Sequence, residues 1–237
     1  ITGINQAYFQ GCLDRNPHLK SKPHGALQLG FSHRDHAIPI PELQSPWDAS
    51  HRAFIYAGAF LPMSLPLWEQ LFDALALLKQ RNQLDAAVRI HLFGTGQNHH
   101  ASLQDLAAMK GIEEVVVEHP ERIPFLHVQE LMRRAEGVLS IGSTEVHYSA
   151  SKTFQCLLSG KKVFSYFHPQ SEARSILRTC QADAFHCDYT SDETAATLLA
   201  STLGSYFAVE QAEWQPDLAP LKAFSAQRSA QILIDTI

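Results

Sequence analysis

Short apolar runs alternate along the chain with longer segments whose apolar residues recur at helical spacing. In the first long segment, Leu67, Leu71 and Leu75 fall on one face of a helix. Strands that alternate with helices favour one parallel sheet with right-handed crossovers and helices on both faces. The sequence therefore predicts an α/β, Rossmann-like fold. The expected strands are Phe54–Tyr56, Val88–Phe93, Val115–Glu118, Gly137–Ile141, Val163–Tyr166 and Ala184–Cys187.

The expected helices follow from the same spacing and from residues that start or stop helices. Ser151 and Lys152 open one helix, and Gly160 stops it. The other expected helices are Leu67–Arg81, Ser102–Lys110, Val128–Ala135, Glu172–Thr179, Glu193–Phe207 and Ala223–Thr236.

Residues 1–50 carry several Pro, His and Gly residues and little periodicity. We expect a short helix over Ile4–Leu13 and a strand or extended segment over Gly25–Phe31. This region is predicted to be a connecting segment, with a mobile leader as the alternative.

Residues 137–166 concentrate the polar groups that are able to bind a ligand. The loop between the two strands of this unit lies at the carboxyl edge of the predicted sheet, where open α/β folds bind ligands. The helix that follows presents free N–H groups that suit a phosphate. Lys152 is expected in the first turn of this helix, where the helix dipole disfavours a cation. A bound anion would relieve that conflict.

The segment YSASKTFQCLLSGKKVFSY resembles the nucleotide-sugar-binding half of GT-B glycosyltransferases, in particular the retaining group-4-like enzymes. The resemblance extends to FIYAGAF, RIHLFGTGQ and FSAQRSAQILIDTI, so it covers most of residues 52–237, and QLGFSHRDH resembles the interdomain connection. It implies that residues 1–50 are an interdomain linker or leader remnant and that residues 51–237 are the donor-binding domain. The chain does not begin with Met, so we expect a fragment whose missing amino-terminal domain carries the acceptor face.

The resemblance also implies positions for the donor. Ser151 and Lys152 would bind the diphosphate, while Ile123 and Phe125 would lie near the base. Glycines at two strand ends, Gly58 and Gly94, allow the backbone to approach the ligand, although a turn is an equally good explanation of Gly58.

The chain departs from the family at several of these positions. Many relatives carry two glutamates eight positions apart, which fall here on His147 and Gln155. Gln155 can still hydrogen-bond a ribose hydroxyl, and Glu145 can substitute for the missing acid. The candidate catalytic residues are therefore His147, Glu145 and Lys152. Where relatives place an Arg and a Lys after the first strand, this chain has Leu61-Pro62-Met63, which puts the donor and the activity in doubt.

The composition limits the classes of partner that we expect for this chain. The formal charge is −5 and the basic residues are scattered, which argues against a nucleic-acid-binding surface. The four cysteines lack paired C-x-x-C spacing, which favours reduced thiols. No apolar run is long enough to span a bilayer. We expect a cytoplasmic protein, or one peripheral to the inner face of the membrane.

The absence of several motifs reduces the range of cofactors that we expect. The chain has no G-x-G-x-x-G, no H-E-x-x-H and no D-x-D motif, so an NAD enzyme is disfavoured and no metal is expected. The expected ligand is a nucleotide sugar of the UDP or GDP type.

The sequence predicts a glycosyltransferase that moves a sugar from a nucleotide diphosphate to a glycan or other acceptor in polysaccharide biosynthesis, this fragment being inactive alone. Two alternatives stay open: a non-catalytic module that binds a nucleotide or a partner protein, and a GT-B-fold nucleotide-sugar epimerase.

Overall fold

The main body of the protein is a six-stranded parallel sheet with strand order β5-β4-β3-β6-β7-β8. The computed structural model describes residues 2–3, 6–27, 30–96, 102–146 and 151–236, with the backbone alone for 2–3, 6–9 and 236. The strands of the main sheet are β3 (Arg52–Ala57), β4 (Val88–Phe93), β5 (Val116–His119), β6 (Gly137–Ile141), β7 (Lys162–Phe167) and β8 (His186–Asp188).

The strand order reverses direction between β3 and β6. From β3 the chain adds β4 and β5 on one side, and it then returns to pair β6 with the other side of β3. Strands β7 and β8 continue outward from β6. Open parallel sheets bind ligands outside the carboxyl ends of their strands at such a switch point.

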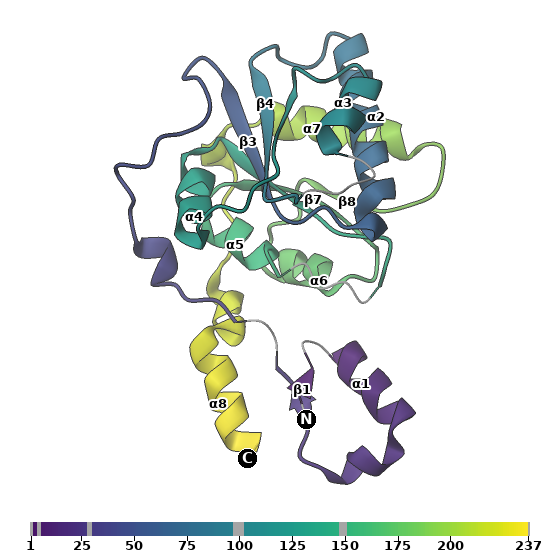
Figure 1. Cartoon of the computed structure of the whole chain (residues 1–237), viewed down its shortest axis with the longest axis vertical. Coiled ribbons are helices and arrows are strands. Elements are labelled where there is room, and N and C mark those ends of the chain that lie inside the picture. Colours follow the sequence, from purple (N-terminus) through teal and green to yellow (C-terminus); the bar gives the residue numbers. More distant parts are fainter. Residues whose placement is uncertain (1, 4–5, 28–29, 97–101, 147–150, 237) are drawn as a thin grey trace.

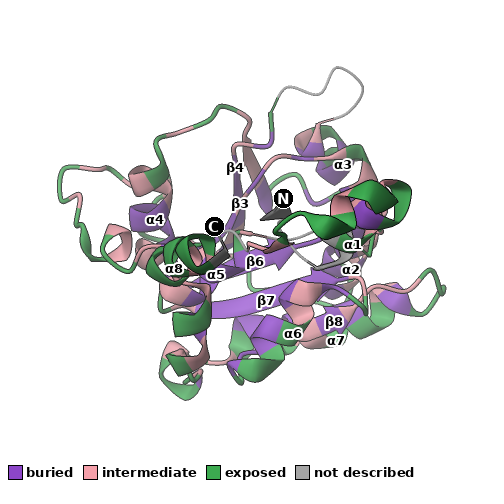
Figure 2. Cartoon of the chain, turned by 90° about the horizontal axis from the view of Figure 1, so that it is seen from below, coloured by how far each residue is buried: buried purple, intermediate pink, exposed green. Residues whose placement is uncertain are grey.

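Helices cover both faces of the sheet (Figure 1), which confirms the predicted α/β, Rossmann-like architecture. On one face α2 packs against α3 and α7, while α4 packs on β3 and α5 packs on β6 and β7. Figure 2 shows β6 and β7 as buried strands with partly exposed helices around them. The helices of the main body are α2 (Leu65–Gln80), α3 (Leu103–Met109), α4 (Phe125–Arg134), α5 (Thr153–Leu158), α6 (Glu172–Thr179) and α7 (Ala195–Ala208).

Residues 2–26 form a small unit that hangs below the main sheet in Figure 1. Strands β1 (Thr2–Gly3) and β2 (Gly25–Ala26) pair in parallel, with α1 (Gln6–Arg15) and the 3-10 helix η1 (Pro17–Ser21) between them in sequence. The last helix, α8 (Ala226–Thr236), extends toward the same end of the molecule. The helix that we expected over Ile4–Leu13 is α1, and the strand or extended segment expected over Gly25–Phe31 begins with β2.

The chain leaves this unit close to the start of α8. The amide of Ala226 donates to the carbonyl of Phe31 at 2.8 Å, and a Cβ added to Gly30 would lie 2.8 Å from the Cα of Ala226. Only a glycine permits this approach. Short 3-10 helices complete the fold: η2 (Asp35–Ala37), η3 (Pro62–Ser64), η4 (Gln211–Glu213) and η5 (Ala219–Phe224).

Two arginines at the end of α4 bind the segment that connects the small unit to β3. Arg133 and Arg134 both pair with Glu130, one turn earlier on the same helix. Their guanidinium groups then donate to main-chain carbonyls of the connecting segment, so this segment is held along α4 by its backbone. The acceptors are the carbonyls of His36, Ile38, Ile40 and Leu43.

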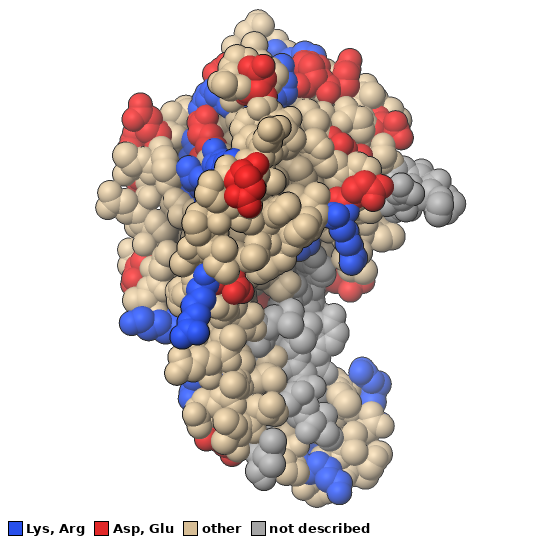
Figure 3. All heavy atoms as spheres, turned by 60° about the vertical axis from the view of Figure 1, so that its left-hand side comes forward, with Lys and Arg blue, Asp and Glu red and all other residues tan. Residues whose placement is uncertain are grey.

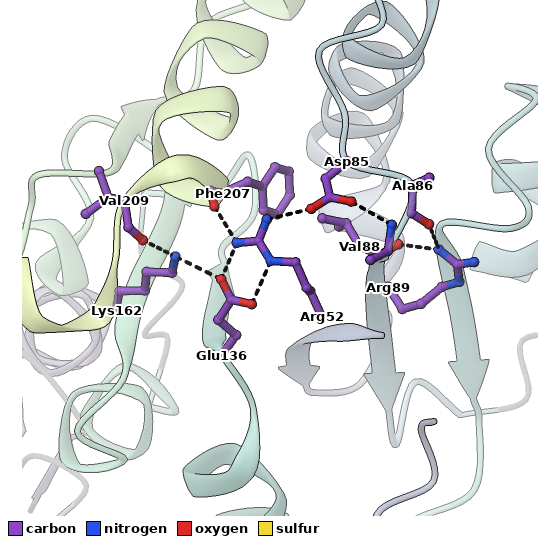
Figure 4. Close-up of polar contacts among 10 residues, drawn as sticks. Arg52, Asp85, Ala86, Val88, Arg89, Glu136, Lys162, Phe207 and Val209 are labelled. Atoms are coloured by element: carbon purple, nitrogen blue, oxygen red, sulfur yellow. Dashed lines mark hydrogen bonds and ion pairs between the residues drawn. The ribbon is translucent and has the colours of Figure 1, made fainter. Parts of the chain in front are cut away.

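Ion pairs join three neighbouring strands at the amino edge of the sheet (Figure 4). Glu136, just before β6, accepts from Arg52 at the start of β3 and from Lys162 at the start of β7. The side chain of Lys162 is 0% exposed, and its Nζ also donates to the carbonyl of Val209 at 2.5 Å. Burial lowers the pKa of Lys162, while the charge of Glu136 opposes that effect.

The surface carries no dominant charge on the face that Figure 3 shows, where acidic and basic side chains are interspersed among uncharged residues. Within the described residues, no helix has the length and apolar character needed to cross a membrane.

The buried ion pairs predict the effect of removing Lys162. Lys162→Met should lower the free energy of unfolding by about 1–3 kcal/mol, because the carbonyl of Val209 loses its buried donor. Urea denaturation measures this change. The matched control is Lys222→Met, which removes an exposed lysine. Equal stability of the two variants would contradict the structural role of Lys162.

Candidate functional site

A pocket of about 290 Å³ opens at the carboxyl ends of β3 and β4, between the sheet and helices α4 and α5. It lies beside the switch point between β3 and β6. The residues that line it are Ala57, Gly58, Ala59, Phe93, Gly94, Arg122, Ile123, Phe125, Val128, Gln129, Met132, Lys152 and Gln155.

Most of the site residues predicted from the sequence meet in this pocket. They come from the ends of four strands and from two helices, and those that line the pocket are Gly58, Gly94, Ile123, Phe125, Lys152 and Gln155. Ser151 lines an adjoining hollow of about 50 Å³ together with Lys152. Glu145 is exposed and does not line the pocket, and His147 lies outside the described residues. The roles predicted for all these residues stay predictions.

The turn after β3 leaves no room for a side chain at position 58. A Cβ at Gly58 would lie 2.4 Å from the hydroxyl of Tyr56 and 3.0 Å from the Nζ of Lys152. Gly94, after β4, has a φ of +69°, which favours glycine for a different reason. The backbone at both strand ends is therefore open to the pocket.

We predicted Lys152 in the first turn of its helix. In the structure it lies immediately before α5. Its side chain is exposed as a whole, but its ammonium group lies close to the turn at Gly58. The pKa of Lys152 falls below its ordinary value, chiefly because the protein displaces water from the ammonium group and also because Arg122 repels it. Neither cation forms an ion pair with a residue that the structure describes.

An apolar wall faces these cations. Ile123 follows β5, and Phe125 is the first residue of α4, which therefore begins before Val128, where we predicted its start. The helix begins there because Pro124, which has a fixed φ, occupies the position before its first turn. Phe125 is 50% exposed, so its ring is accessible at the edge of the pocket.

The sequence did not reveal three residues at the pocket: Arg122, Gln129 and His36. Gln129, on α4, is 1% exposed and lines the pocket beside Gln155. His36 reaches Gln155 from the connecting segment, with 2.5 Å between its Nε2 and the Oε1 of Gln155. Burial lowers the pKa of His36, although the hydrogen bond to Gln155 acts in the opposite direction. Arg122 alone had a local signal, because it lies in the short segment after the predicted strand Val115–Glu118.

A pair of stacked histidines lies beside Phe93, which lines the pocket. His119 stacks on Phe93 with 4.4 Å between ring centroids, and its Nε2 lies 3.0 Å from the Nδ1 of His91. The Nε2 of His91 is buried without a partner. Burial first, and the nearby His119 second, lower the pKa of His91 to about 4.

A serine, a histidine and an aspartate also form a chain of hydrogen bonds on β7 and β8. Ser165 Oγ lies 2.9 Å from His186 Nδ1, and His186 Nε2 lies 3.0 Å from Asp188 Oδ1. Ser165 is 0% exposed, so no substrate reaches its hydroxyl. We interpret this chain as a support for the edge of the sheet and not as a hydrolase site.

Metal ligands do not cluster in the described part of the chain: no group of three or more His, Cys, Asp or Glu side chains there is placed to hold an ion. The four cysteines are free thiols.

Comparison with known proteins identifies the fold. Neither a protein-family model nor a curated protein matches the sequence. Among solved structures, a UDP-forming α,α-trehalose-phosphate synthase from Burkholderia xenovorans matches 100% of this chain and 60% of its own, with a TM-score of 0.68 and 13% identity. The chain has the fold of a GT-B glycosyltransferase domain.

Other GT-B structures match over similar lengths. WaaG, a glycosyltransferase involved in lipopolysaccharide biosynthesis, matches 97% of this chain and 57% of its own, with a TM-score of 0.60 and 12% identity. S. aureus TarM, in complex with UDP among other ligands, matches 99% of this chain and 43% of its own, with a TM-score of 0.59 and 11% identity. This GT-B domain spans about half the length of the solved structures that it matches.

The buried histidine predicts how the stability of the GT-B domain depends on pH. Because the pKa of His91 is lower in the folded state than its ordinary value of 6.5, the unfolded chain binds more protons between about pH 6.5 and 4. Stability should be fully present above pH 6.5 and should fall by up to about 3 kcal/mol as the pH drops through this window. Urea denaturation at several pH values measures the loss.

The control for this prediction is His91→Phe, which keeps an aromatic ring but cannot be protonated. The variant should lose a smaller part of its stability between pH 6.5 and 4. An unchanged pH profile would show that other groups cause the loss.

The crowded turn predicts that Gly58→Ala is harmful. Because the new methyl group would overlap the hydroxyl of Tyr56, the variant should lose about 1–3 kcal/mol of stability. Gly25→Ala is a matched control, since a Cβ there meets nothing within 4 Å. Thermal unfolding of both variants checks this, and equal melting temperatures would show that the turn adjusts without cost.

Proposed function

We propose that this chain binds the nucleotide-sugar donor of a glycosyltransferase. One observation carries the proposal: the pocket at the switch point combines an apolar wall with two cations, and its described lining contains no Asp or Glu. An apolar wall suits a nucleotide base, and cations without acidic partners suit a diphosphate. The GT-B fold, shared with structures of enzymes that transfer sugars, supports the same assignment.

The placement of the donor follows from the lining residues. We assign the base to Ile123 and Phe125, and the ribose to Gln155. The diphosphate lies at the Gly58 turn, between Lys152 and Arg122. Arg122 supplies a second cation in a chain that lacks the Arg and Lys its relatives often have after the first strand. Ser151, in the adjoining hollow, is placed to contact the same diphosphate.

The two cations also suit the chemistry of transfer. When the bond between the sugar and the diphosphate breaks, negative charge grows on the leaving diphosphate, and fixed cations stabilise that charge. A bound diphosphate also favours the charged form of Lys152, whose pKa is lowered by burial. We therefore propose a metal-independent site. Glu145, which follows β6, and His147, which lies outside the described residues, stay candidates for contact with the sugar.

The acceptor remains outside this assignment. Because the chain spans about half the length of the structures that it matches, we propose that a glycan or other acceptor binds to a further domain of the same protein. The chain alone would then bind the donor without transferring its sugar.

A non-catalytic nucleotide-binding module is the second candidate. The observation that favours it is the absence of any carboxylate from the described pocket lining. Transfer or hydrolysis of a sugar nucleotide by the full-length protein would exclude this candidate. The epimerase alternative has the fold as its only support, and an epimerised donor formed without acceptor would favour it.

Calorimetric titration with UDP, GDP and ADP, with and without EDTA, tests the proposal. One nucleotide should bind with a Kd between about 1 μM and 1 mM, and EDTA should not change the Kd. Absence of binding to all three nucleotides would contradict the proposed donor site.

Removing either cation should weaken binding selectively. Arg122→Ala and Lys152→Ala should each raise the Kd for the nucleoside diphosphate by about tenfold, because each removes a charge-assisted contact to phosphate. The Kd for the uncharged nucleoside should change little. Arg178→Ala, which removes an exposed cation on α6, is the control. A uniform loss for nucleoside and nucleotide would place the cations away from the phosphates.

A further inference from the structure

Three side chains from distant parts of the sequence meet beside the pocket, and two of them, Gln129 and Gln155, line it. His36 comes from η2, Gln129 from α4 and Gln155 from α5. The Oε1 of Gln155 lies 2.5 Å from the Nε2 of His36 and 2.9 Å from the Nε2 of Gln129. One oxygen atom is therefore the common partner of two nitrogen atoms.

The buried atoms that remain without a hydrogen-bond partner indicate which groups are the donors in this cluster. With the Gln155 oxygen as common acceptor, the buried atoms without a partner are the Nδ1 of His36 and the Oε1 of Gln129, both of which can be acceptors. Turning both amides around would instead bury an N–H of His36 and the whole NH₂ group of Gln129 without acceptors. Buried N–H groups without partners are rarer than under-satisfied acceptors. The first arrangement is therefore favoured, and it places the proton of His36 on Nε2. The Nε2 of Gln129, 3.1 Å from this ring nitrogen, is then a second donor beside it and not its hydrogen-bond partner.

This arrangement leaves Gln155 with only one group to offer to a ligand. Both nitrogen atoms already donate to its Oε1, whereas its Nε2 has no partner among the described residues and is not among the fully buried atoms. Gln155 lines the pocket together with Arg122 and Lys152. The polar side-chain groups that these three residues present are all hydrogen-bond donors.

We infer that His36 and Gln129 are positioning residues that orient the Gln155 amide, so that the pocket recognises a hydrogen-bond acceptor on its ligand at this point. This inference rests on the proposed function for the identity of the ligand, whose acceptor we assign to a ribose hydroxyl oxygen. A carboxylate at position 155 would do the opposite, since it accepts hydrogen bonds from hydroxyl groups and donates none.

The first test does not need a ligand. Ring nitrogen chemical shifts of His36, measured by ¹⁵N NMR on the whole chain at neutral pH, report which nitrogen carries the proton. The inference requires Nε2–H, and an Nδ1–H tautomer would overturn it whether or not a nucleotide binds. This result is thus separate from the fate of the proposed function, which fails if no nucleotide binds to the wild-type chain.

The second test uses Gln155→Glu with the nucleotide that binds the wild-type chain and with its uncharged nucleoside. The Kd should rise by about tenfold or more for both, because the donor is lost. The nucleoside excludes charge repulsion from the phosphates as the cause. A Kd for the nucleoside that is unchanged or lower would overturn the inference, because the ligand would then not need a hydrogen-bond donor from position 155.

A double-mutant cycle then tests the positioning role of His36. His36→Leu should raise the Kd by about threefold or more in the wild-type background, and it should have no further effect in a Gln155→Leu background. His36→Gln keeps an N–H donor and should restore part of the affinity. Additive effects of the two leucine substitutions would mean that His36 acts on general stability and not through Gln155. Melting temperatures confirm that each variant is folded, and Gln83→Leu, an exposed amide beyond the end of α2, is the control.

Discussion

A single carboxylate, Glu136, joins the starts of three neighbouring strands. Arg52 approaches it from β3 and Lys162 from β7, while Glu136 itself directly precedes β6. A lysine that is 0% exposed remains charged only if a partner and hydrogen bonds compensate for the lost water. The three strands must therefore begin at matching levels. Because they are parallel, their other ends also align, and the switch-point pocket forms beside those ends.

The two edges of the sheet differ in whether their charged side chains have partners of opposite charge. At the amino edge, Arg52, Lys162 and Glu136 satisfy one another and main-chain carbonyls. At the carboxyl edge, Arg122 and Lys152 line the pocket without an acidic partner among the described residues, and partial loss of water lowers the pKa of Lys152. A cation that loses water without gaining an acidic partner is a feature of functional sites more often than of structural ones, because a ligand can supply the opposite charge.

The sequence predicted the fold well where burial determines it. The bounds of Val88–Phe93 and Gly137–Ile141 were predicted correctly at both ends, because both strands lie inside the sheet and are buried almost throughout. The strand at the edge was less well placed, since β8 covers His186–Asp188 and not Ala184–Cys187. A polar edge strand lacks the pattern that marks a buried one.

The sequence predicted only those site residues that a local sequence pattern marks. Residues at strand ends, such as Gly58, Gly94 and Lys152, could be found because parallel strands bring their ends together. His36 could not, since 93 positions separate it from Gln129 and no local pattern relates the two. Such a contact depends on how the connecting segment crosses α4, which the fold alone decides.

The hydrogen bonds from Arg133 and Arg134 to the connecting segment have an evolutionary consequence. Both arginines bind main-chain carbonyls, which every amino acid provides, proline included. Residues between His36 and Leu43 can therefore drift in sequence without loosening the crossing, whereas the arginines and their common partner Glu130 cannot. Among homologues, we expect this segment to vary in its side chains and to keep its length, with His36 as the exception.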